Sequence, residues 1–78
     1  MISDEQIYEV IKTVLPDIDT SMISHDADLK SYGMDSIDMF NVILGLQDLL
    51  GKEIPDSEVD KLKTISLIKE YLKSNDEF

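Results

Sequence analysis

The chain has 78 residues, with 17 acidic and 7 basic side chains, a formal charge of −10 and no cysteine. This length supports one domain, over residues 1–78, and its small core argues against a complete enzyme. The acidic surface argues against binding to nucleic acids or anionic membranes. The absence of cysteine excludes disulfides and thiolate metal sites.

No apolar run approaches the roughly 18 residues that a membrane-spanning helix needs. The N-terminal residues are acidic, whereas those of a signal peptide would be basic. We therefore expect a cytoplasmic protein that does not insert into membranes. We also expect a monomer whose negative charge attracts basic protein partners.

The hydrophobic spacing predicts four helical segments and no strand. The expected fold class is therefore all-α: a small four-helix bundle of three longer helices and one short helix, with a long first loop. The first helix is expected over about residues 3–15. Ser3 and Gln6 form a capping box at its start, and Pro16 ends it.

A polar connection over residues 16–34 follows, and it is too long for a tight turn between helices. It has room for a short helical turn. Four of its side chains are expected to hold it against the core, namely Met22, Ile23, Leu29 and Tyr32.

The second helix is expected over Ser36–Leu50, with Gly51 as its C-terminal stop. Apolar side chains cover roughly two-thirds of its circumference, so the helix is either buried at the centre of the bundle or lines an apolar ligand site. Ile37 is expected to anchor its first turn. Four residues form a narrow polar strip that should face solvent: Asp38, Asn41, Gly45 and Asp48.

A short helix is expected over residues 56–62, with its start capped by Asp56 or Ser57. The last helix is expected over about residues 65–73, with Thr64 as its N-cap. The C-terminal residues beyond it should fray. The buried face of the last helix would consist of Ile65, Leu67, Ile68, Tyr71 and Leu72.

Two other kinds of site can be assembled from these residues, and both fail. Residues 17–28 begin like a calcium-binding loop, but Met22 occupies its glycine position and Asp28 its bidentate glutamate position. Ser36, His25 and an aspartate would make a hydrolase triad, but no glycine-framed nucleophile elbow surrounds the serine. We therefore expect no catalytic residue and no dedicated metal site, and we interpret His25 as a loop residue.

The pair Asp35-Ser36 follows a glycine and opens the most apolar helix. Either residue is a common helix cap, and capping alone would explain the pair. However, Gly33 permits a sharp turn that presents the residues after it. The positive end of the helix would also favour a phosphate attached to Ser36. These local features favour a hydroxyl presented for modification without excluding the cap.

The segment LKSYGMDSIDMF resembles the modification motif of acyl carrier proteins, L-x-x-x-G-x-D-S-[LI], at Leu29, Gly33, Asp35, Ser36 and Ile37. The resemblance covers nearly the whole chain, since KEIPDSEVDKLKTISLIKEYL is similar to the family's third and fourth helices. It implies that a phosphopantetheinyl transferase attaches 4′-phosphopantetheine from coenzyme A to Ser36 through a phosphodiester, with Asp35 beside it. The thiol of this arm would hold acyl groups as thioesters, so the protein would be a non-catalytic shuttle.

The resemblance also implies partner enzymes: an acyl-loading ligase or acyltransferase, and a ketosynthase or other acyl-processing enzyme of fatty-acid, polyketide or related biosynthesis. They would dock on the second and third helices, at Asp35, Asp38, Met39, Asp48, Asp56, Glu58 and Asp60. Five apolar side chains would either shelter an acyl chain or form ordinary core, namely Met39, Phe40, Ile43, Ile54 and Ile65.

Four positions depart from the family pattern. Asn41 and Gln47 stand where general fatty-acid carriers tend to have glutamate, Tyr32 replaces leucine, and Met34 replaces a small residue. We therefore expect a specialised carrier, as in a polyketide, non-ribosomal peptide or lipid-modification pathway, in which Met34 tunes partner choice or the path of the arm. Primary fatty-acid synthesis stays open as the other pathway. The alternative is an unmodified acidic helical adaptor that binds a basic protein partner.

Overall fold

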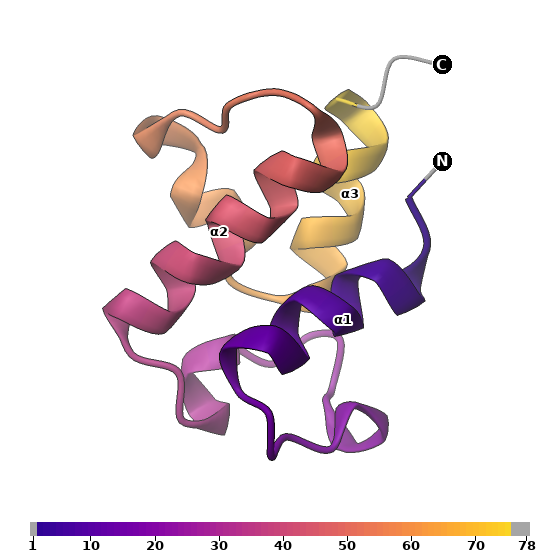
Figure 1. Ribbon diagram of the computed structural model, residues 1–78, viewed down its shortest axis with the longest axis vertical. Coiled ribbons are helices and arrows are strands. Elements are labelled where there is room, and N and C mark those ends of the chain that lie inside the picture. Colours follow the sequence, from indigo (N-terminus) through magenta and orange to yellow (C-terminus); the bar gives the residue numbers. More distant parts are fainter. Residues whose placement is uncertain (1, 76–78) are drawn as a thin grey trace.

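The computed structural model describes residues 2–75, none of which lies in a strand. Three α-helices and three 3₁₀ segments follow one another along this part of the chain (Figure 1). They are α1 (Asp4–Val14), η1 (Thr20–Met22), η2 (Leu29–Tyr32), α2 (Ser36–Leu50), η3 (Asp56–Leu62) and α3 (Ile65–Asn75). The predicted all-α fold, with three longer helices, one shorter helix and a long first loop, is confirmed.

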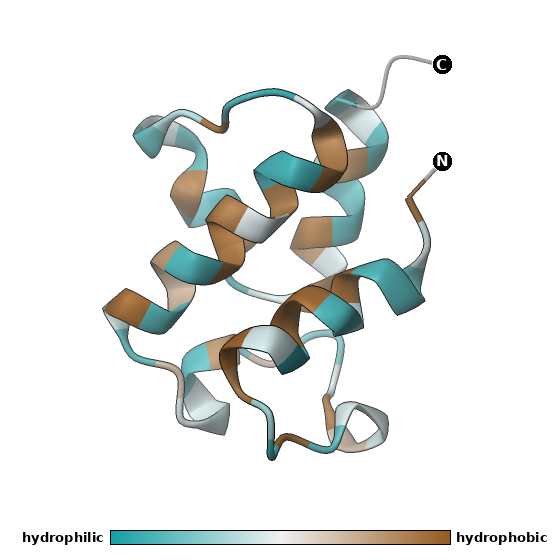
Figure 2. Cartoon of the chain, in the orientation of Figure 1, coloured by the Kyte–Doolittle hydropathy of each residue, from teal (hydrophilic) through white to brown (hydrophobic). Residues whose placement is uncertain are grey.

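One apolar core joins the helices. Figure 2 shows that apolar residues recur at nearly every turn of α2, whereas α1 has a polar side and an apolar side. No polar or charged side chain of the described residues is buried. Burying each large apolar side chain stabilises the fold by about 1.5–3 kcal/mol. The most completely buried are Ile7, Ile11, Leu29, Val42, Leu46, Leu62, Ile65 and Ile68.

The start of α1 has the predicted capping box. The Gln6 backbone N–H donates to Ser3 Oγ at 3.3 Å, and the Ser3 N–H donates to Gln6 Oε1 at 2.8 Å. Lys69 of α3 donates to Asp4 Oδ2 at 3.2 Å and so ties α3 to this end of α1. Because nearly half of each side chain is exposed to solvent, this ion pair contributes only modestly to stability.

The long connection after α1 is held to the core by three of the four side chains expected to do so. Ile23 and Leu29 are buried, and Tyr32 packs on the core while its hydroxyl accepts a hydrogen bond from the Ser24 N–H at 2.7 Å. Met22 is 74% exposed, so its predicted core role is wrong. It ends η1, a single 3₁₀ turn that buries none of its side chains.

Two aspartates of this connection cap its short turns. Asp19 accepts hydrogen bonds from the Ser21 hydroxyl at 2.6 Å and the Ser21 N–H at 3.0 Å, and these bonds lower the pKa of its carboxyl. Asp28 accepts from the Lys30 N–H at 2.9 Å.

Within residues 2–75, no three His, Cys, Asp or Glu side chains gather in a way that would hold a metal ion.

His25 is a loop residue, as predicted, and it joins two helices. Its Nε2 lies 2.7 Å from the hydroxyl of Tyr8 in α1. Its carbonyl oxygen accepts a hydrogen bond from the N–H of Ser66 in α3 at 2.9 Å. The histidine therefore has a structural role.

η3 and α3, the predicted third and fourth helices, begin differently. η3 spans the predicted residues, but it is a 3₁₀ helix whose N-cap is Pro55 and which has no side-chain cap, so the predicted cap by Asp56 or Ser57 is wrong. α3 is capped as predicted, because the Leu67 N–H donates to Thr64 Oγ1 at 3.1 Å.

α3 continues further than predicted, to Asn75, whose side-chain amide donates to the Tyr71 carbonyl oxygen at 2.9 Å. Ser74 is therefore helical where fraying was expected, and residues 76–78 lie outside the described part. Leu67 is 37% exposed, because the buried side of α3 follows positions 65, 68 and 72. No described helix is both long enough and apolar enough to cross a membrane.

Candidate functional site

The turn before α2 places neighbouring residues in opposite environments. Gly33 closes η2 with a φ of +93°, a left-handed conformation that is strained for residues with a side chain. Met34 then enters the core at 3% exposure, whereas Asp35 and Ser36 are exposed. Met34 is therefore a packing residue, and its influence on partner choice or on the path of the arm stays a prediction.

Asp35, and not Ser36, caps α2. Asp35 Oδ1 accepts the Asp38 N–H at 2.8 Å, and Asp38 Oδ2 accepts the Asp35 N–H at 3.2 Å. This reciprocal capping box satisfies the backbone without the serine. Ser36 is the first residue of the helix, and its exposed hydroxyl has no hydrogen-bond partner among the described residues.

The first turn of α2 has backbone N–H groups free to bind an anion, although two carboxylates lie in its cap. An α-helix leaves its first backbone N–H groups without intrahelical partners, and its dipole adds positive potential there. Asp35 takes up the Asp38 N–H, but the N–H groups of Ser36 and Ile37 have no partner within residues 2–75. A phosphate on the Ser36 hydroxyl would therefore meet unused donors.

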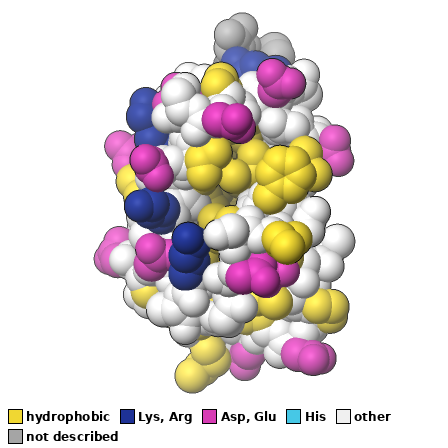
Figure 3. All heavy atoms as spheres, turned by 90° about the vertical axis from the view of Figure 1, so that its left-hand side faces the viewer, with side chains coloured by type: hydrophobic (Ala, Val, Ile, Leu, Met, Phe, Trp, Pro, Cys, Tyr) yellow, Lys and Arg dark blue, Asp and Glu magenta, His cyan; other side chains and the backbone are white. Residues whose placement is uncertain are grey.

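A groove of about 230 Å³ opens beside Ser36 between η2, α2 and η3. Met39 and Ile43 form its apolar wall and are otherwise buried, whereas Phe40 is 58% exposed at its rim. On this face of the molecule, lysine and hydrophobic side chains border a hollow (Figure 3). The groove also has charged residues, namely Asp28, Lys30, Asp60 and Lys63.

An apolar stripe runs along the outer side of α2. Ile37 is 71% exposed, Phe40 58% and Leu44 41%, and these residues are three and four positions apart. The predicted anchoring role of Ile37 is therefore wrong. Apolar residues occur all around this helix, so their spacing does not reveal which side the neighbouring elements cover. Because there are more of them than one buried side can hold, their number indicated that some would be exposed.

The acids predicted to bind partners lie in different local settings. Asp35 and Asp38 build the cap, Asp56 is exposed at the start of η3, and Asp48 lines the groove between α1 and α2, which Asp38 also lines. Met39, predicted with them, is only 7% exposed, so little of its side chain is accessible to a partner.

Glu58 and Asp60 of η3 each pair with a lysine. Glu58 Oε2 lies 2.8 Å from Lys61 Nζ, and their hydrogen bond raises the pKa of Lys61. Asp60 Oδ1 lies 3.7 Å from Lys63 Nζ, a looser pair on the exposed surface. The negative charge of both acids is thus partly compensated.

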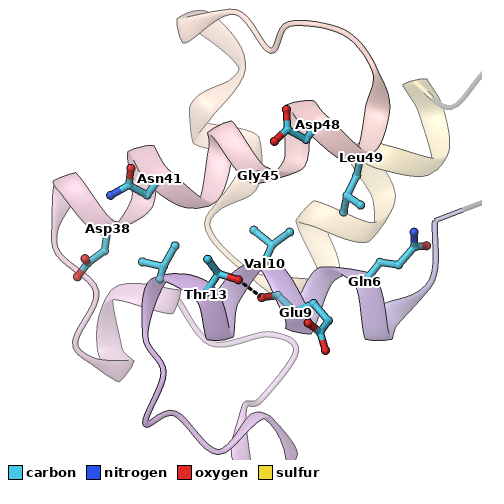
Figure 4. Close-up of a pocket in the computed structure, with 10 residues that line it drawn as sticks. Gln6, Glu9, Val10, Thr13, Asp38, Asn41, Gly45, Asp48 and Leu49 are labelled. Carbon is cyan, nitrogen blue, oxygen red and sulfur yellow. Dashed lines mark hydrogen bonds between the residues drawn. The ribbon is translucent and has the colours of Figure 1, made fainter.

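The polar strip of α2 faces α1 across a groove of about 600 Å³ (Figure 4). Asn41 and Asp48 are exposed there as predicted, but Gly45 packs against α1. A Cβ atom at Gly45 would lie 2.6 Å from Val10 Cγ1, so only glycine permits this close approach. The strip is therefore partly a packing surface.

Known proteins resemble this chain along most of its length. The family described as "Phosphopantetheine attachment site" matches residues 5–72. The chain is 36% identical over 77 residues to the acyl carrier protein of Lactobacillus acidophilus, covering 94% of this chain and 96% of the relative. It is 32% identical over 77 residues to the acyl carrier protein of Lactobacillus johnsonii, with the same coverage. It is 31% identical over 72 residues to the mitochondrial acyl carrier protein 2 of Arabidopsis thaliana, covering 91% of this chain and 56% of that protein.

Proposed function

Because this chain belongs to the acyl carrier protein family, whose cofactor is 4′-phosphopantetheine, we propose that Ser36 bears this group. A phosphopantetheinyl transferase attaches the arm from coenzyme A through a phosphodiester. The thiol of the arm holds acyl groups as thioesters, and the protein carries them between enzymes without catalysing a step itself.

The free hydroxyl of Ser36 is the observation that carries this proposal. Asp35 and Asp38 satisfy the cap between them, so the serine hydroxyl takes no part in capping α2. Ser57 follows an aspartate too and is also exposed, but it lies in a 3₁₀ helix of seven residues. It therefore lacks the dipole and N–H donors of a long α-helix.

The surroundings of Ser36 fit the two parts of the group. Its phosphate would lie at the N-terminus of α2, where anions are favoured. The rest of the arm leaves from the edge of the groove that Met39 and Ile43 line with apolar atoms. Ile54 and Ile65 are buried in the core and are not among the residues that line this groove.

We place the carrier in a specialised pathway because two positions of α2 lack the acidic groups of general fatty-acid carriers. Asn41 is exposed and neutral. Gln47 has a structural role, since its Oε1 accepts the Ile54 N–H at 2.9 Å and so braces the link after α2. A less acidic α2 selects other partners and changes their association rates.

A loading experiment tests the carrier role. Protein bearing the arm is incubated with a radiolabelled fatty acid, ATP and a promiscuous acyl-loading ligase. We expect label on the protein that neutral hydroxylamine releases, because a thioester is sensitive to it. Ser57→Ala should load like the wild type and Ser36→Ala should stay unlabelled. Label that resists hydroxylamine, or that persists in Ser36→Ala, contradicts the proposal.

Partner enzymes are proposed to dock on the outer side of α2, close to the attachment site. Ile37, Phe40 and Leu44 offer exposed apolar contact area, and aromatic side chains often dominate binding energy at such sites. The exposed acids Asp35 and Asp56 would attract basic residues of the partner. The apolar stripe therefore supplies affinity, and the acids mainly steer the approach.

The docking proposal predicts that Phe40→Ser slows transfer of the arm by the transferase, or acyl loading, by about tenfold, equivalent to roughly 1.4 kcal/mol. The melting temperature should change little, because the Phe40 side chain is largely exposed. Met22→Ser removes an apolar side chain that is 74% exposed on η1 and should not affect the rate. Equal rates for both variants would place docking elsewhere.

A further inference from the structure

Lys30 and Lys63 come from distant parts of the sequence to the groove beside Ser36. The Leu29 N–H donates to the Lys63 carbonyl oxygen at 2.8 Å, which joins η2 to the segment between η3 and α3. Both lysines line the same groove as Ser36. Two of the chain's seven basic residues thus border the proposed attachment site, on a protein with a net charge of −10.

Both ammonium groups can accept a further anion. Lys30 forms no ion pair within residues 2–75. Lys63 pairs with Asp60 at 3.7 Å, with side-chain exposures of 55% and 89%, and such pairs contribute little and exchange readily. The other acid of the groove, Asp28, already accepts the Lys30 backbone N–H.

We propose that Lys30 and Lys63 bind the phosphodiester of the arm on Ser36 and direct the root of the arm into the groove. This inference rests on the proposed function. The covalent bond fixes the phosphate next to Ser36 Oγ, at the edge of the groove that both lysines line. The two ammonium groups offset the repulsion from Asp35 and Asp38, whose carboxylates lie in the cap beside the serine.

A carboxylate at the end of an acyl group would present the same chemistry, but the phosphate is the stronger candidate. It is held in place by the protein, whereas an acyl terminus reaches the groove only by ordering the whole arm, at an entropic cost. The two sources differ in when they arrive, since the phosphate is present before any acyl group is loaded.

The test compares apo and arm-bearing forms of the wild type, Lys30→Gln/Lys63→Gln and the control Lys12→Gln, each verified by intact mass. Lys12 lies on α1, outside the residues that line the groove. The first readout is the ³¹P chemical shift of the phosphodiester at low salt and at about 0.5 M salt, where the Debye length is roughly 4 Å. The second is the change in melting temperature when the arm is attached.

We expect the wild-type ³¹P signal to move with salt, and the double variant to show the high-salt position already at low salt. The change in melting temperature on attachment of the arm should be about 2–6 °C lower in the double variant than in the wild type. Lys12→Gln should behave like the wild type. Equal ³¹P shifts and equal melting changes in wild type and double variant would overturn the inference.

A further measurement identifies the anion that the two lysines bind. Backbone amide signals of Lys30 and Lys63 should shift when the arm is attached, before loading. If they shift only after loading an acyl group with a terminal carboxylate, the lysines bind the acyl group and the inference is wrong. If intact mass shows that the wild type accepts no arm at all, the proposed function fails. If the arm is attached but the lysines do not respond to it, only the inference about the lysines fails.

Discussion

At the scale of the residue, Asp38 combines two roles that its charge alone does not reveal. Its carboxylate accepts the Asp35 N–H, and its own N–H donates to Asp35, so it holds the cap of α2. It also places a negative charge near the proposed attachment site. A charge reversal there changes folding and recognition together, and the two effects must be separated by the choice of substitution.

We predict that Asp38→Lys lowers the free energy of unfolding by about 1 kcal/mol, because lysine cannot accept the Asp35 N–H and places positive charge at the positive end of the helix. Asp38→Gln should cost less than about half of that, since glutamine is common at this position of a capping box. Urea unfolding of the two apo variants measures this. Equal losses of unfolding free energy would show that the hydrogen bond from the Asp35 N–H to this side chain contributes nothing to stability. Asp38→Gln removes the charge while keeping an acceptor for that bond, so it also reports the effect of the charge on loading.

At the scale of the element, α1 and α2 approach each other closely because residue 45 of α2 is a glycine. Val10 of α1 lies where a Cβ of residue 45 would be, and valine is stiff about χ1 and cannot easily turn aside. Gly45 weakens the interior of α2 as a helix, by roughly 1 kcal/mol relative to alanine. The close contact between the helices compensates for that loss.

Gly45→Ala is therefore expected to destabilise the wild type by up to about 2 kcal/mol, because the overlap with Val10 exceeds the gain in helix propensity. In a Val10→Ala background the same change should stabilise the protein by about 0.5–1 kcal/mol. A double-mutant cycle by urea unfolding measures the coupling. If Gly45→Ala stabilises both backgrounds, the two helices can separate at little cost.

The elements were predictable where a local signal marks their ends. Ser3 with Gln6, Gly51 and Thr64 mark helix ends through caps that involve neighbouring residues, and all three were placed correctly. Burial was less predictable, because it depends on what covers a residue. Ile37 was therefore expected to anchor its turn of the helix but is exposed, and the burial of Met34 was not predicted.

The geometry of the candidate site was predictable only in part, and the attachment of a group to Ser36 stays a prediction. The motif gives the serine, the turn and the cap, but the groove depends on a contact between η2 and the segment after η3, which are over 30 positions apart in sequence. No periodicity in either segment indicates that contact. Lys30 and Lys63 consequently gave no sequence signal, although both lie beside Ser36 in the fold.

At the scale of the whole molecule, the negative charge opposes folding. Acidic side chains outnumber basic ones by 17 to 7, and the ion pairs at Glu58, Asp60 and Asp4 are partly exposed to solvent. Exposed pairs of this kind contribute little, whereas the repulsion acts among all the acids. Screening should therefore favour the folded state.

We predict that raising NaCl from low concentration to about 0.5 M increases the melting temperature of the apo protein by roughly 5–10 °C. Asp17→Lys/Asp48→Lys changes the charge by two units at each of two exposed positions, from −10 to −6, and should flatten this dependence. Thermal melts followed by circular dichroism measure both proteins. A wild-type melting temperature that does not respond to salt would mean that the repulsion is small.

The central claim is that Ser36 alone bears the arm, and intact mass tests it directly. Apo wild type, Ser36→Ala and Ser57→Ala are incubated with coenzyme A and a broad-specificity phosphopantetheinyl transferase. We predict a single addition of phosphopantetheine to the wild type and Ser57→Ala, and none to Ser36→Ala. An unmodified wild type under these conditions, or an addition that persists in Ser36→Ala, would contradict the account.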